Sequence, residues 1–567
     1  MIMRKLSMEI LVLALCACTV VPAIAAPVPA ADQPRTPDQV IDRVVSNEQR
    51  LLAQMRDYSP LVETYIQNLK ADKDLGQIPA GDKYFLGRAN FQKGVNLVPL
   101  NETQGKGKKV FGSIGNFFSF AMQFLPDGFL QMIFIDTNGF DKQHYKFDYV
   151  RREFLGEVRC LVFDVTPTEK NNKGRFMGRI WVEDQDFHIV RFNGSYNGNG
   201  HSSWYFHFDS WRTNVQPGLW LPTFVYSEEK DLHYAISKKL DFKAQTRLWG
   251  YNLGAASQEQ ELSKILVETP MQDDTKTSND VSPIQAQRSW DRQAEDNVTD
   301  RLERIGLMAP KGEVDKVLET VINNLEVTNN IDVDPEVRCR VLMTSTLESF
   351  TIGHTIVLSR GLVDVLPDEA SLATMLAHEL SHVVLGHRVD SQYAFFDNLM
   401  VEDKDTFRHF GFARTPEEEH QANEKAIQIL NNSPYKNQLG NAGLFLQALD
   451  AREKEIPNLI SGHLGNRVPQ ISDLKSTTPV DPKQNPQKIA ALPLGGRVKI
   501  DPWTDQLNLI KSKPVGTVAE REKMPFEVTP FMPYLTRFGN EASKPVAASA
   551  VAPSEGKPGD SPDPSKP

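Results

Sequence analysis

The chain has 567 residues, a formal net charge of -10 at pH 7, and no basic tract. Its length predicts two or three domains, each able to bury a core of its own. The acidic balance argues against nucleic acid as a partner. Of four cysteines, only Cys160 and Cys339 follow the N-terminal region; these are too few for a disulfide framework and are expected to be buried thiols.

Residues 1–26 have the pattern of a secretory signal peptide. Arg4 and Lys5 form a positively charged start, an apolar stretch follows, and residues 23–25 fit small-x-small cleavage. The apolar stretch is too short for a membrane span, and no other stretch reaches about 18 apolar residues. The mature chain is therefore expected in the periplasm without a transmembrane span, with peripheral membrane association left open. Lipid attachment at Cys18 is an alternative, although a cysteine at position 16 is unusual for a lipoprotein signal.

Residues 27–81 are expected to form a spacer and N-terminal helices. Thr36-Pro37-Asp38-Gln39 has the form of a capping box, and a second helix is expected from Pro60. From 82 to 255 the apolar period changes to two, which is typical of strands. Because no long helix interrupts this region, it predicts an antiparallel, strongly curved, half-barrel-like sheet. Strands are expected at 129–134, 145–150, 159–165, 175–183, 188–192, 204–208 and 221–226.

Residues 256–312 are polar and are expected to be a linker with helical pieces. Between 313 and 455, an apolar helical stripe at 314–325 precedes strands at 337–343 and 350–358, and a covering helix is expected at 442–449. Residues 456–540 are Pro-rich and are expected to wrap the folded parts, and 541–567 should be disordered. The predicted fold class is α+β, with a β-rich N-terminal domain and a mainly helical domain that carries a short edge-strand sheet.

The stretch from His378 to His382 reads H-E-x-x-H within a predicted helix that opens at Pro367-Asp368-Glu369 and ends at Gly386. On a helix, His378 and His382 project from one face, one turn apart, so that two imidazoles can bind one zinc ion. Glu379 lies about 100° around the helix, where it can take a proton from a zinc-bound water. The alternative, a chance match, would predict neither a helix nor a third ligand.

Further along, Thr415-Pro416 predicts the start of a second helix, which carries Glu417, Glu418 and Glu419. H-E-x-x-H, then Gly386-His387, then Glu419-x-Gln421-Ala422-Asn423 together resemble the gluzincin peptidases of the CAAX-prenyl-protease type. Their soluble relatives include the periplasmic beta-barrel-assembly-enhancing proteases. The resemblance implies one zinc ion per chain, bound by His378, His382 and Glu419, with Glu379 as the general base. It also implies a substrate bound along a strand edge near the motif.

Glu417 and Glu418 compete with Glu419 for the role of third ligand. The spacing favours Glu419, because it lies four residues before Asn423 and both side chains therefore point the same way. The family has Asp at the Asn423 position, where it accepts a hydrogen bond from the outer nitrogen of a ligating histidine. Asparagine can still accept that bond but lacks the negative charge, so the histidine should bind zinc more weakly.

Residues 178–183 and 189–192 resemble the outer-membrane lipoprotein-sorting fold, which implies a concave apolar face; the alternative is a structural domain that flanks the enzyme. The expected function is that of a zinc-dependent endopeptidase that cleaves unfolded or unassembled envelope proteins. One alternative is a chaperone or lipoprotein carrier with a lapsed zinc site, and another is a zinc amidase acting on the cell wall. The sequence leaves the donor that stabilises the oxyanion open among four residues, His387, His409, Arg414 and Tyr435.

Overall fold

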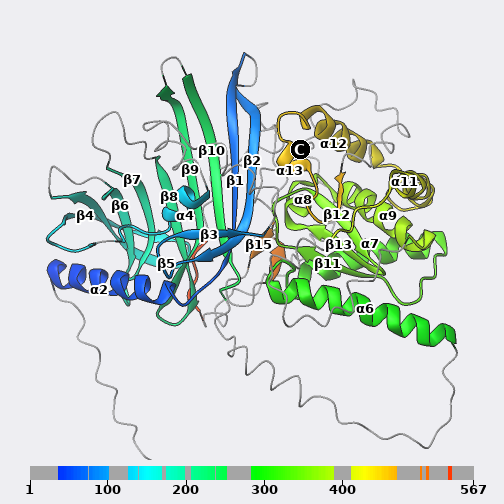
Figure 1. The fold of residues 1–567 in the computed structure, drawn as a ribbon, viewed down its shortest axis with the longest axis horizontal. Helices are drawn as coiled ribbons and strands as arrows, with labels where there is room; N and C mark the ends of the chain where they lie inside the picture. Colours follow the sequence, from blue (N-terminus) through cyan, green and yellow to red (C-terminus); the bar gives the residue numbers. More distant parts are fainter. Residues whose placement is uncertain are drawn as a thin grey trace, which may run out of the picture. The chain divides into compact units, whose positions relative to one another are not determined.

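The computed structural model describes residues 36–73, 76–100, 126–137, 139–168, 174–197, 206–235, 238–251, 283–387, 410–468, 498–500, 506–509 and 534–538 (Figure 1). The chain divides into two units, residues 1–43 and residues 44–567. Of the first unit, only the beginning of helix α2 (Pro37–Met55) and the preceding Thr36 are described. The predicted signal peptide, Cys18, residues 256–282 of the linker, most of 469–540 and the tail lie outside the described residues.

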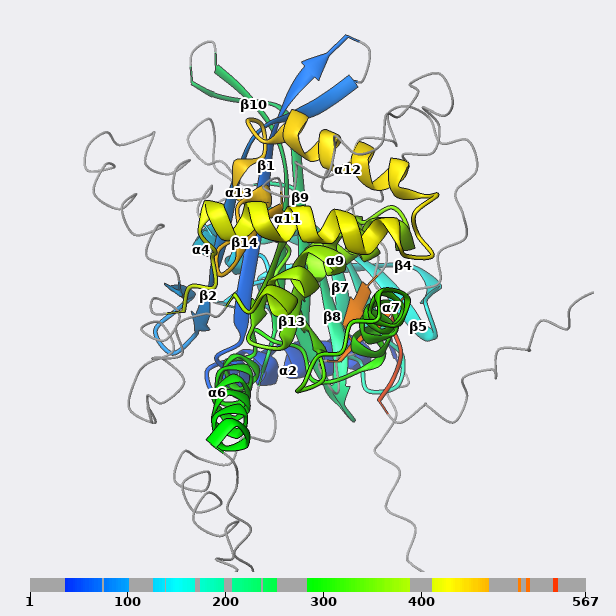
Figure 2. The same cartoon turned by 90° about the vertical axis from the view of Figure 1, so that its right-hand side faces the viewer.

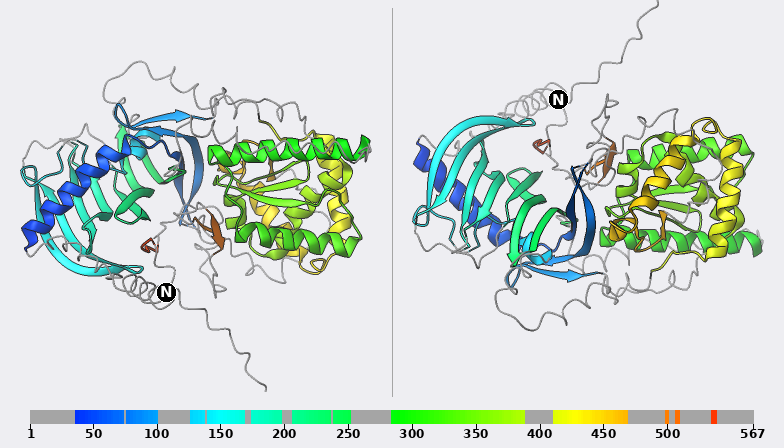
Figure 3. Two further views of the ribbon diagram at one scale, coloured as in Figure 1. Left: turned by 90° about the horizontal axis from the view of Figure 1, so that it is seen from below. Right: turned by 90° about the horizontal axis from the view of Figure 1, so that it is seen from above.

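Ten strands of the described chain form one sheet in the order β3-β2-β1-β10-β9-β8-β7-β6-β5-β4. All neighbouring strands are antiparallel. The sheet is strongly curved, and its edges β3 and β4 do not meet (Figure 3). The predicted curved antiparallel sheet is thus confirmed. The strands are β1 (Leu61–Asp72), β2 (Gly76–Asn90), β3 (Asn96–Pro99), β4 (Tyr145–Leu155), β5 (Val158–Pro167), β6 (Phe176–Glu183), β7 (Ile189–Tyr196), β8 (Phe208–Gln216), β9 (Leu219–Ala235) and β10 (Lys238–Trp249).

The helix expected from Pro60 is wrong, because residues 61–72 form strand β1 in the interior of the sheet. Every side chain from Leu61 to Gln67 is buried. A strand that is covered on both faces loses the alternation of apolar and polar residues that would identify it. Its remaining apolar positions, among them Leu61 and Tyr65, also fit a helical stripe.

One predicted strand is also wrong, and another begins later than expected. Residues 126–131 form the short helix α4 (Pro126–Gln131), in which Pro126 and Asp127 stand where a helix start favours proline and an acidic residue. The buried run that includes Phe129 and Leu130 was apolar without a period, and such a run does not distinguish helix from strand. The strand expected at 204–208 instead begins at Phe208, and Trp204 lies outside the described residues.

A buried ion pair fixes α2 to strand β8. Arg212 donates to both carboxylate oxygens of Glu48, at 2.6 and 2.7 Å, and both side chains are 1 % exposed. Glu48→Gln should therefore lower the free energy of unfolding by about 3–5 kcal/mol, because the guanidinium would stay buried without its counter-charge. Chemical denaturation followed by circular dichroism measures the loss. The surface variant Asp148→Asn, which breaks the exposed pair with Lys146, should cost at most about 1 kcal/mol; equal costs would contradict the prediction.

A second sheet of the described chain has the order β11-β13-β12-β14, with β11 and β13 parallel and the other pairs antiparallel. Helices α9, α11 and α12 lie side by side next to this sheet (Figure 2). Val314, Leu318, Val321, Ile322 and Leu325 of α7 are buried, which confirms the predicted stripe. The elements are α6 (Pro283–Ile305), α7 (Glu313–Asn329), β11 (Arg338–Leu342), β12 (Glu348–Ile352), β13 (Thr355–Ser359), α8 (Arg360–Val365), α9 (Glu369–Leu385), α11 (Pro416–Asn431), α12 (Leu439–Arg452), α13 (Pro457–Ile460) and β14 (Asn466–Arg467), with the separate pair β15 (Val498–Ile500) and β16 (Leu507–Leu509).

The single strand expected at 350–358 is a hairpin of β12 and β13 with a tight turn at Gly353 and His354. Gly353 has φ +58°, and an added Cβ would meet the Glu295 carboxylate. Glycine is therefore required at this turn. The hairpin makes β13 an interior strand, so the strand that precedes the H-E-x-x-H helix in sequence is not an edge strand. The short strand β14 pairs with the outer side of β12, at Glu348 and Ser349.

Within residues 44–567, buried hydrogen bonds connect strand β1 to the segment before β12. The carboxylate of Glu63 accepts from the backbone N–H and the hydroxyl of Ser345, both at 2.6 Å, and from Arg360 at 3.4 Å. These three side chains are almost fully buried. The segment that leads into β12 is therefore held by groups that could not exchange these bonds for water without unfolding locally.

Candidate metal centre

Helix α9 carries the H-E-x-x-H motif and has the ends that the sequence predicts. Asp368 caps its start by accepting from the backbone N–H and the hydroxyl of Ser371, at 2.8 and 2.7 Å. Gly386 ends it in the left-handed conformation that favours glycine. Its side chains from Ala373 to His382 are all buried. The two histidines are thus fixed on a helix packed on all sides.

The three consecutive glutamates of helix α11 differ in their contacts and in their burial. Thr415 and Glu418 form a capping box, and the bonds from Thr415 lower the pKa of Glu418. Glu417 is exposed and accepts from Gln421 at 3.1 Å. Only Glu419 of the three is buried, and it faces the two histidines of α9. Of the three glutamates, Glu419 is therefore the one that can bind a metal ion together with the two histidines.

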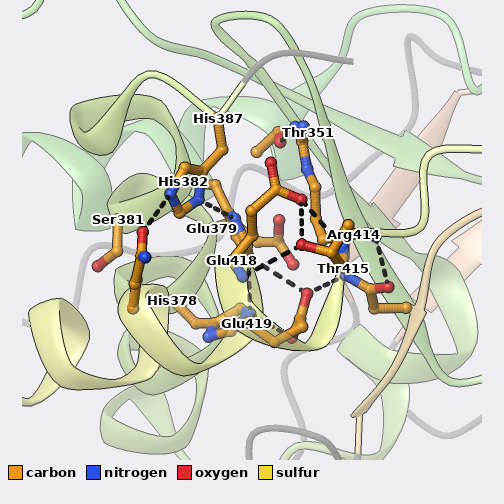
Figure 4. Close-up of polar contacts among 12 residues, drawn as sticks. Thr351, His378, Glu379, Ser381, His382, His387, Arg414, Thr415, Glu418 and Glu419 are labelled. Atoms are coloured by element: carbon orange, nitrogen blue, oxygen red, sulfur yellow. Dashed lines mark hydrogen bonds and ion pairs between the residues drawn. The ribbon is translucent and has the colours of Figure 1, made fainter. Parts of the chain in front are cut away.

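The three predicted ligands meet in one place (Figure 4). Nε2 of His378 and Nε2 of His382 lie 3.1 Å apart, and they lie 3.3 and 3.4 Å from Oε2 and Oε1 of Glu419. A tetrahedral zinc ion with bonds of about 2.05 Å holds its ligand atoms about 3.3 Å apart. The three side chains are 1 %, 1 % and 7 % exposed. Among the described residues, this is the group of His, Cys, Asp and Glu side chains spaced to hold a metal ion.

The electrostatics of the cluster favour a bound cation. Burial raises the pKa of Glu419, but hydrogen bonds and charge from His378 and His382 outweigh it and hold that pKa at about 2. Burial lowers the pKa of His378, and Glu419, Glu379 and Asn423 outweigh it in turn and raise that pKa. Oε2 of Glu419 is also buried, and among the described residues it lies 3.3 Å from Nε2 of His378. Two imidazole nitrogens and a carboxylate oxygen are the donors that zinc prefers, so these residues fit the ion.

Glu379 lies beside the cluster, not in it. Its side chain is buried, and its Oε1 accepts a hydrogen bond of 2.6 Å from the hydroxyl of Ser349 on β12. The hydroxyl fixes the carboxylate in one orientation next to the three ligand atoms. No spacing in the sequence connected Ser349 with the motif.

Two further residues near the cluster were not predicted as part of it. Asn466 of β14 donates from its side chain to Oε1 of Glu419 and accepts from the backbone N–H of Arg414 at 2.9 Å. Nη2 of Arg414 donates to the hydroxyl of Thr351 on β12 at 2.6 Å. The contact of Asn466 with Glu419 depends on how β14 pairs with β12, which nothing in the sequence around Asn466 indicates.

Of the four residues left open as oxyanion donors, two are engaged elsewhere. The ring of His387 lies between Nδ1 of His382, at 3.0 Å, and Gln421, at 3.2 Å, on the side of His382 away from the ligand atoms. Tyr435 donates to Glu369 in the first turn of α9, at 2.8 Å. The third candidate, His409, lies outside the described residues. His354, which is not one of the four, pairs with Glu295 at 2.9 Å. Arg414 is the remaining candidate, and the charges of Glu379, Glu418 and Glu419 act on its guanidinium.

Asn423 lies on α11 one turn after Glu419 and interacts with the imidazole of His378, where it helps to raise the pKa of that ring. Asn423→Asp should increase the affinity for zinc by about tenfold, because a charged acceptor makes the ligating imidazole a better donor to the metal. Competition with a coloured chelator measures the affinity. Asn431→Asp, at an exposed position of the same helix, is the control, and unchanged or weaker binding by Asn423→Asp would contradict the prediction.

In the described part of the chain, no helix is long and apolar enough to cross a membrane. No curated protein matches the sequence. Among solved structures, an outer-membrane lipoprotein-sorting protein domain from Vibrio parahaemolyticus is 11 % identical over 39 % of this chain and 98 % of its own, with a TM-score of 0.18. A DUF1329 family protein from Desulfovibrio piger is also 11 % identical, over 40 % of this chain and 98 % of its own, with the same TM-score.

The sequence model of Peptidase family M48 matches residues 309–436. The matched range begins just before α7 and ends after α11, so it contains His378, Glu379, His382 and Glu419 together with the β12–β13 hairpin. The predicted gluzincin resemblance is confirmed for this range. Residues 309–436 are therefore a Peptidase family M48 domain, which is a metallopeptidase domain.

Proposed function

We propose that this protein is a zinc-dependent endopeptidase of the cell envelope. One observation carries the proposal: in a peptidase domain, two buried imidazole nitrogens lie 3.1 Å apart and 3.3 and 3.4 Å from the two oxygens of the Glu419 carboxylate, close to the spacing of tetrahedral zinc ligands, beside a second buried carboxylate. His378, His382 and Glu419 would hold the ion. Asn423 would orient the ring of His378.

When bound at this site, zinc supplies the positive charge that acidifies a water molecule and polarises a peptide carbonyl. Glu379 takes a proton from the water and later gives it to the nitrogen of the leaving amine. Ser349 keeps the Glu379 carboxylate oriented for both transfers. The buried walls of α9 and β12 exclude other water, so that charges in the site act at low dielectric.

The location and the substrate class rest on the sequence alone. The signal-like residues 1–26 support export to the periplasm, with lipid attachment at Cys18 as the alternative. The resemblance to beta-barrel-assembly-enhancing proteases supports unfolded or unassembled envelope proteins as substrates, and the net charge of -10 disfavours nucleic acid.

Purified protein loaded with zinc should hydrolyse unfolded casein and should leave cell-wall fragments intact. Cleavage of the fragments alone would favour the amidase alternative. Protection of unfolded protein from aggregation without any cleavage would favour a chaperone whose metal site has lapsed.

Ser349→Ala should lower kcat by about tenfold and change KM little, because Glu379 would lose the bond that orients it. Steady-state hydrolysis of a fluorogenic casein peptide measures both constants, and metal content should stay at that of the wild type. Ser461→Ala, outside the hydrogen bonds of the site, is the control. A rise in KM at constant kcat would show that Ser349 acts on substrate binding instead.

A further inference from the structure

Arg414 carries a positive charge toward the acidic groups of the metal centre. It lies just before α11, and its side chain is half-buried. Burial lowers the pKa of Arg414, whereas the charges of Glu379, Glu418 and Glu419 raise it. An arginine remains protonated at neutral pH under such shifts. The guanidinium is thus a fixed cation within the electrostatic reach of both the general base and a metal ligand.

The side chain of Arg414 is held on the face of β12 that also holds Glu379. Ser349 and Thr351 are two residues apart on this strand, so their side chains point to the same face, about 7 Å apart. Ser349 donates to Glu379, and Thr351 accepts from Nη2 of Arg414, both at 2.6 Å. One face of β12 therefore contacts both the Glu379 carboxylate and the Arg414 guanidinium.

The backbone of Arg414 is fixed as well. Its N–H donates to Asn466 at 2.9 Å, and Asn466 donates in turn to Glu419. Glu419 itself lies in the first turn of α11, which begins two residues after Arg414. The side chain of Arg414 is consequently bonded to β12, and its backbone is connected through Asn466 to a predicted zinc ligand.

One N–H donor of the Arg414 guanidinium is not used by the protein. Its Nε is buried and has no hydrogen-bond partner among the described residues. The Nε atoms of Arg338 and Arg340 are also buried in this way, so what distinguishes Arg414 is that its free donor lies within the electrostatic reach of Glu379 and Glu419. A substrate oxygen is an acceptor that would satisfy this group.

We propose that Arg414 is a catalytic residue that donates hydrogen bonds to the oxygen of the scissile carbonyl while negative charge develops on it. This inference rests on the proposed peptidase function. The water oxygen forms a bond to the carbonyl carbon, its proton goes to Glu379, and the electron pair of the C=O π bond moves to the carbonyl oxygen. The C–N bond then breaks, the C=O bond re-forms, and Glu379 passes the proton to nitrogen. The guanidinium stabilises the charge on oxygen between these two events.

The test compares wild type, Arg414→Gln, Arg414→Lys and Thr351→Val, each loaded with zinc, on a fluorogenic casein peptide. Arg304→Gln, at an exposed position near the end of α6, is the matched control. Metal content and Tm are measured for every variant. A phosphonate peptide built on the mapped cleavage site, which carries a tetrahedral anion in place of the scissile bond, gives a readout that is independent of turnover.

Arg414→Gln should lower kcat by about 10²–10³-fold, as loss of an oxyanion donor does. KM, metal content and Tm should stay near wild type, and the phosphonate should bind about 10²-fold more weakly. Arg414→Lys should lower kcat less than Arg414→Gln does, because lysine keeps the positive charge but lacks the paired N–H donors of the guanidinium. Thr351→Val should lower kcat by about threefold to tenfold, as a positioning residue.

The proposal is overturned if Arg414→Gln keeps kcat within about threefold of wild type, or if its metal content falls in step with its activity. If Arg414→Gln does not fold, Arg414→Lys is the deciding variant. Full activity of Arg414→Lys with unchanged phosphonate affinity would then overturn the proposal that the guanidinium donates to the carbonyl oxygen. Wild type that binds zinc and cleaves nothing overturns the peptidase function, and this inference with it. Wild type that cleaves, with Glu379→Gln inactive and Arg414→Gln fully active, overturns the inference alone.

Discussion

Glutamine in place of Glu379 is expected to lower kcat for casein hydrolysis by about 10²–10⁴-fold while one zinc ion per chain remains bound. Glutamine has nearly the shape of glutamate and can still contact the hydroxyl of Ser349, which lies 2.6 Å from the carboxylate. It cannot, however, take a proton from water. Because the three predicted ligands are other residues, zinc binding should be unchanged.

Glu424→Gln makes the same chemical change at an exposed position of α11 and is the matched control. Steady-state kinetics and elemental analysis are measured on the same preparations. Full activity of Glu379→Gln would remove the general base from the account. Loss of zinc in that variant would instead show that Glu379 is a ligand and that the roles assigned to the four acidic and imidazole groups are wrong.

Alanine in place of Glu419 is expected to weaken zinc binding by more than about 100-fold, since loss of an outer-sphere partner alone costs 10- to 100-fold. The two imidazoles would remain on α9, 3.1 Å apart at Nε2, with no third donor to complete the set. The purified variant should retain little metal after dialysis, and hydrolysis should fall with it. Mass spectrometry of the metal, expressed per chain, measures the loss.

Glu417→Ala provides the comparison that the sequence itself suggests, because the two glutamates are two residues apart. Glu417 is exposed and contacts Gln421 instead of the histidines, so its variant should keep a full complement of zinc. His420→Ala, also exposed, serves the same purpose beside His378→Ala. Equal metal loss in Glu417→Ala and Glu419→Ala would mean that the acidic run binds metal diffusely.

The helices of the site could be predicted because their ends are encoded locally. Asp368 and Gly386 stand at the two ends of α9, and Thr415 with Glu418 forms the capping box of α11. Side chains that bond to neighbouring backbone atoms act over three or four residues, so the signal is present in a short window. The spacing of His378 and His382 then follows from helix geometry alone.

The parts of the fold that the sequence did not predict depend on distant residues. Strand β1 is an interior strand buried on both faces, which removes the alternation that marks a strand. The hairpin turn at Gly353 is fixed by contact with Glu295, 58 residues earlier in the chain. In both cases tertiary packing decided between conformations that local patterns leave nearly equal.

The same limit applies to the surroundings of the metal centre. Asn466 reaches Glu419 because β14 pairs with the edge of β12, a pairing of only two residues on each strand. Ser349 and Thr351 reach Glu379 and Arg414 because β12 lies against α9. A serine, a threonine and an asparagine are common on any strand, so no residue type or spacing singles them out before the fold is known.

The most direct measurement is a crystal structure of the zinc-loaded protein with diffraction recorded on both sides of the zinc absorption edge. We predict one anomalous peak per chain, about 2.0–2.2 Å from Nε2 of His378, Nε2 of His382 and a carboxylate oxygen of Glu419. It should disappear below the edge. A zinc peak bound by other residues, or well-ordered density for all three side chains with no metal between them, would contradict the account.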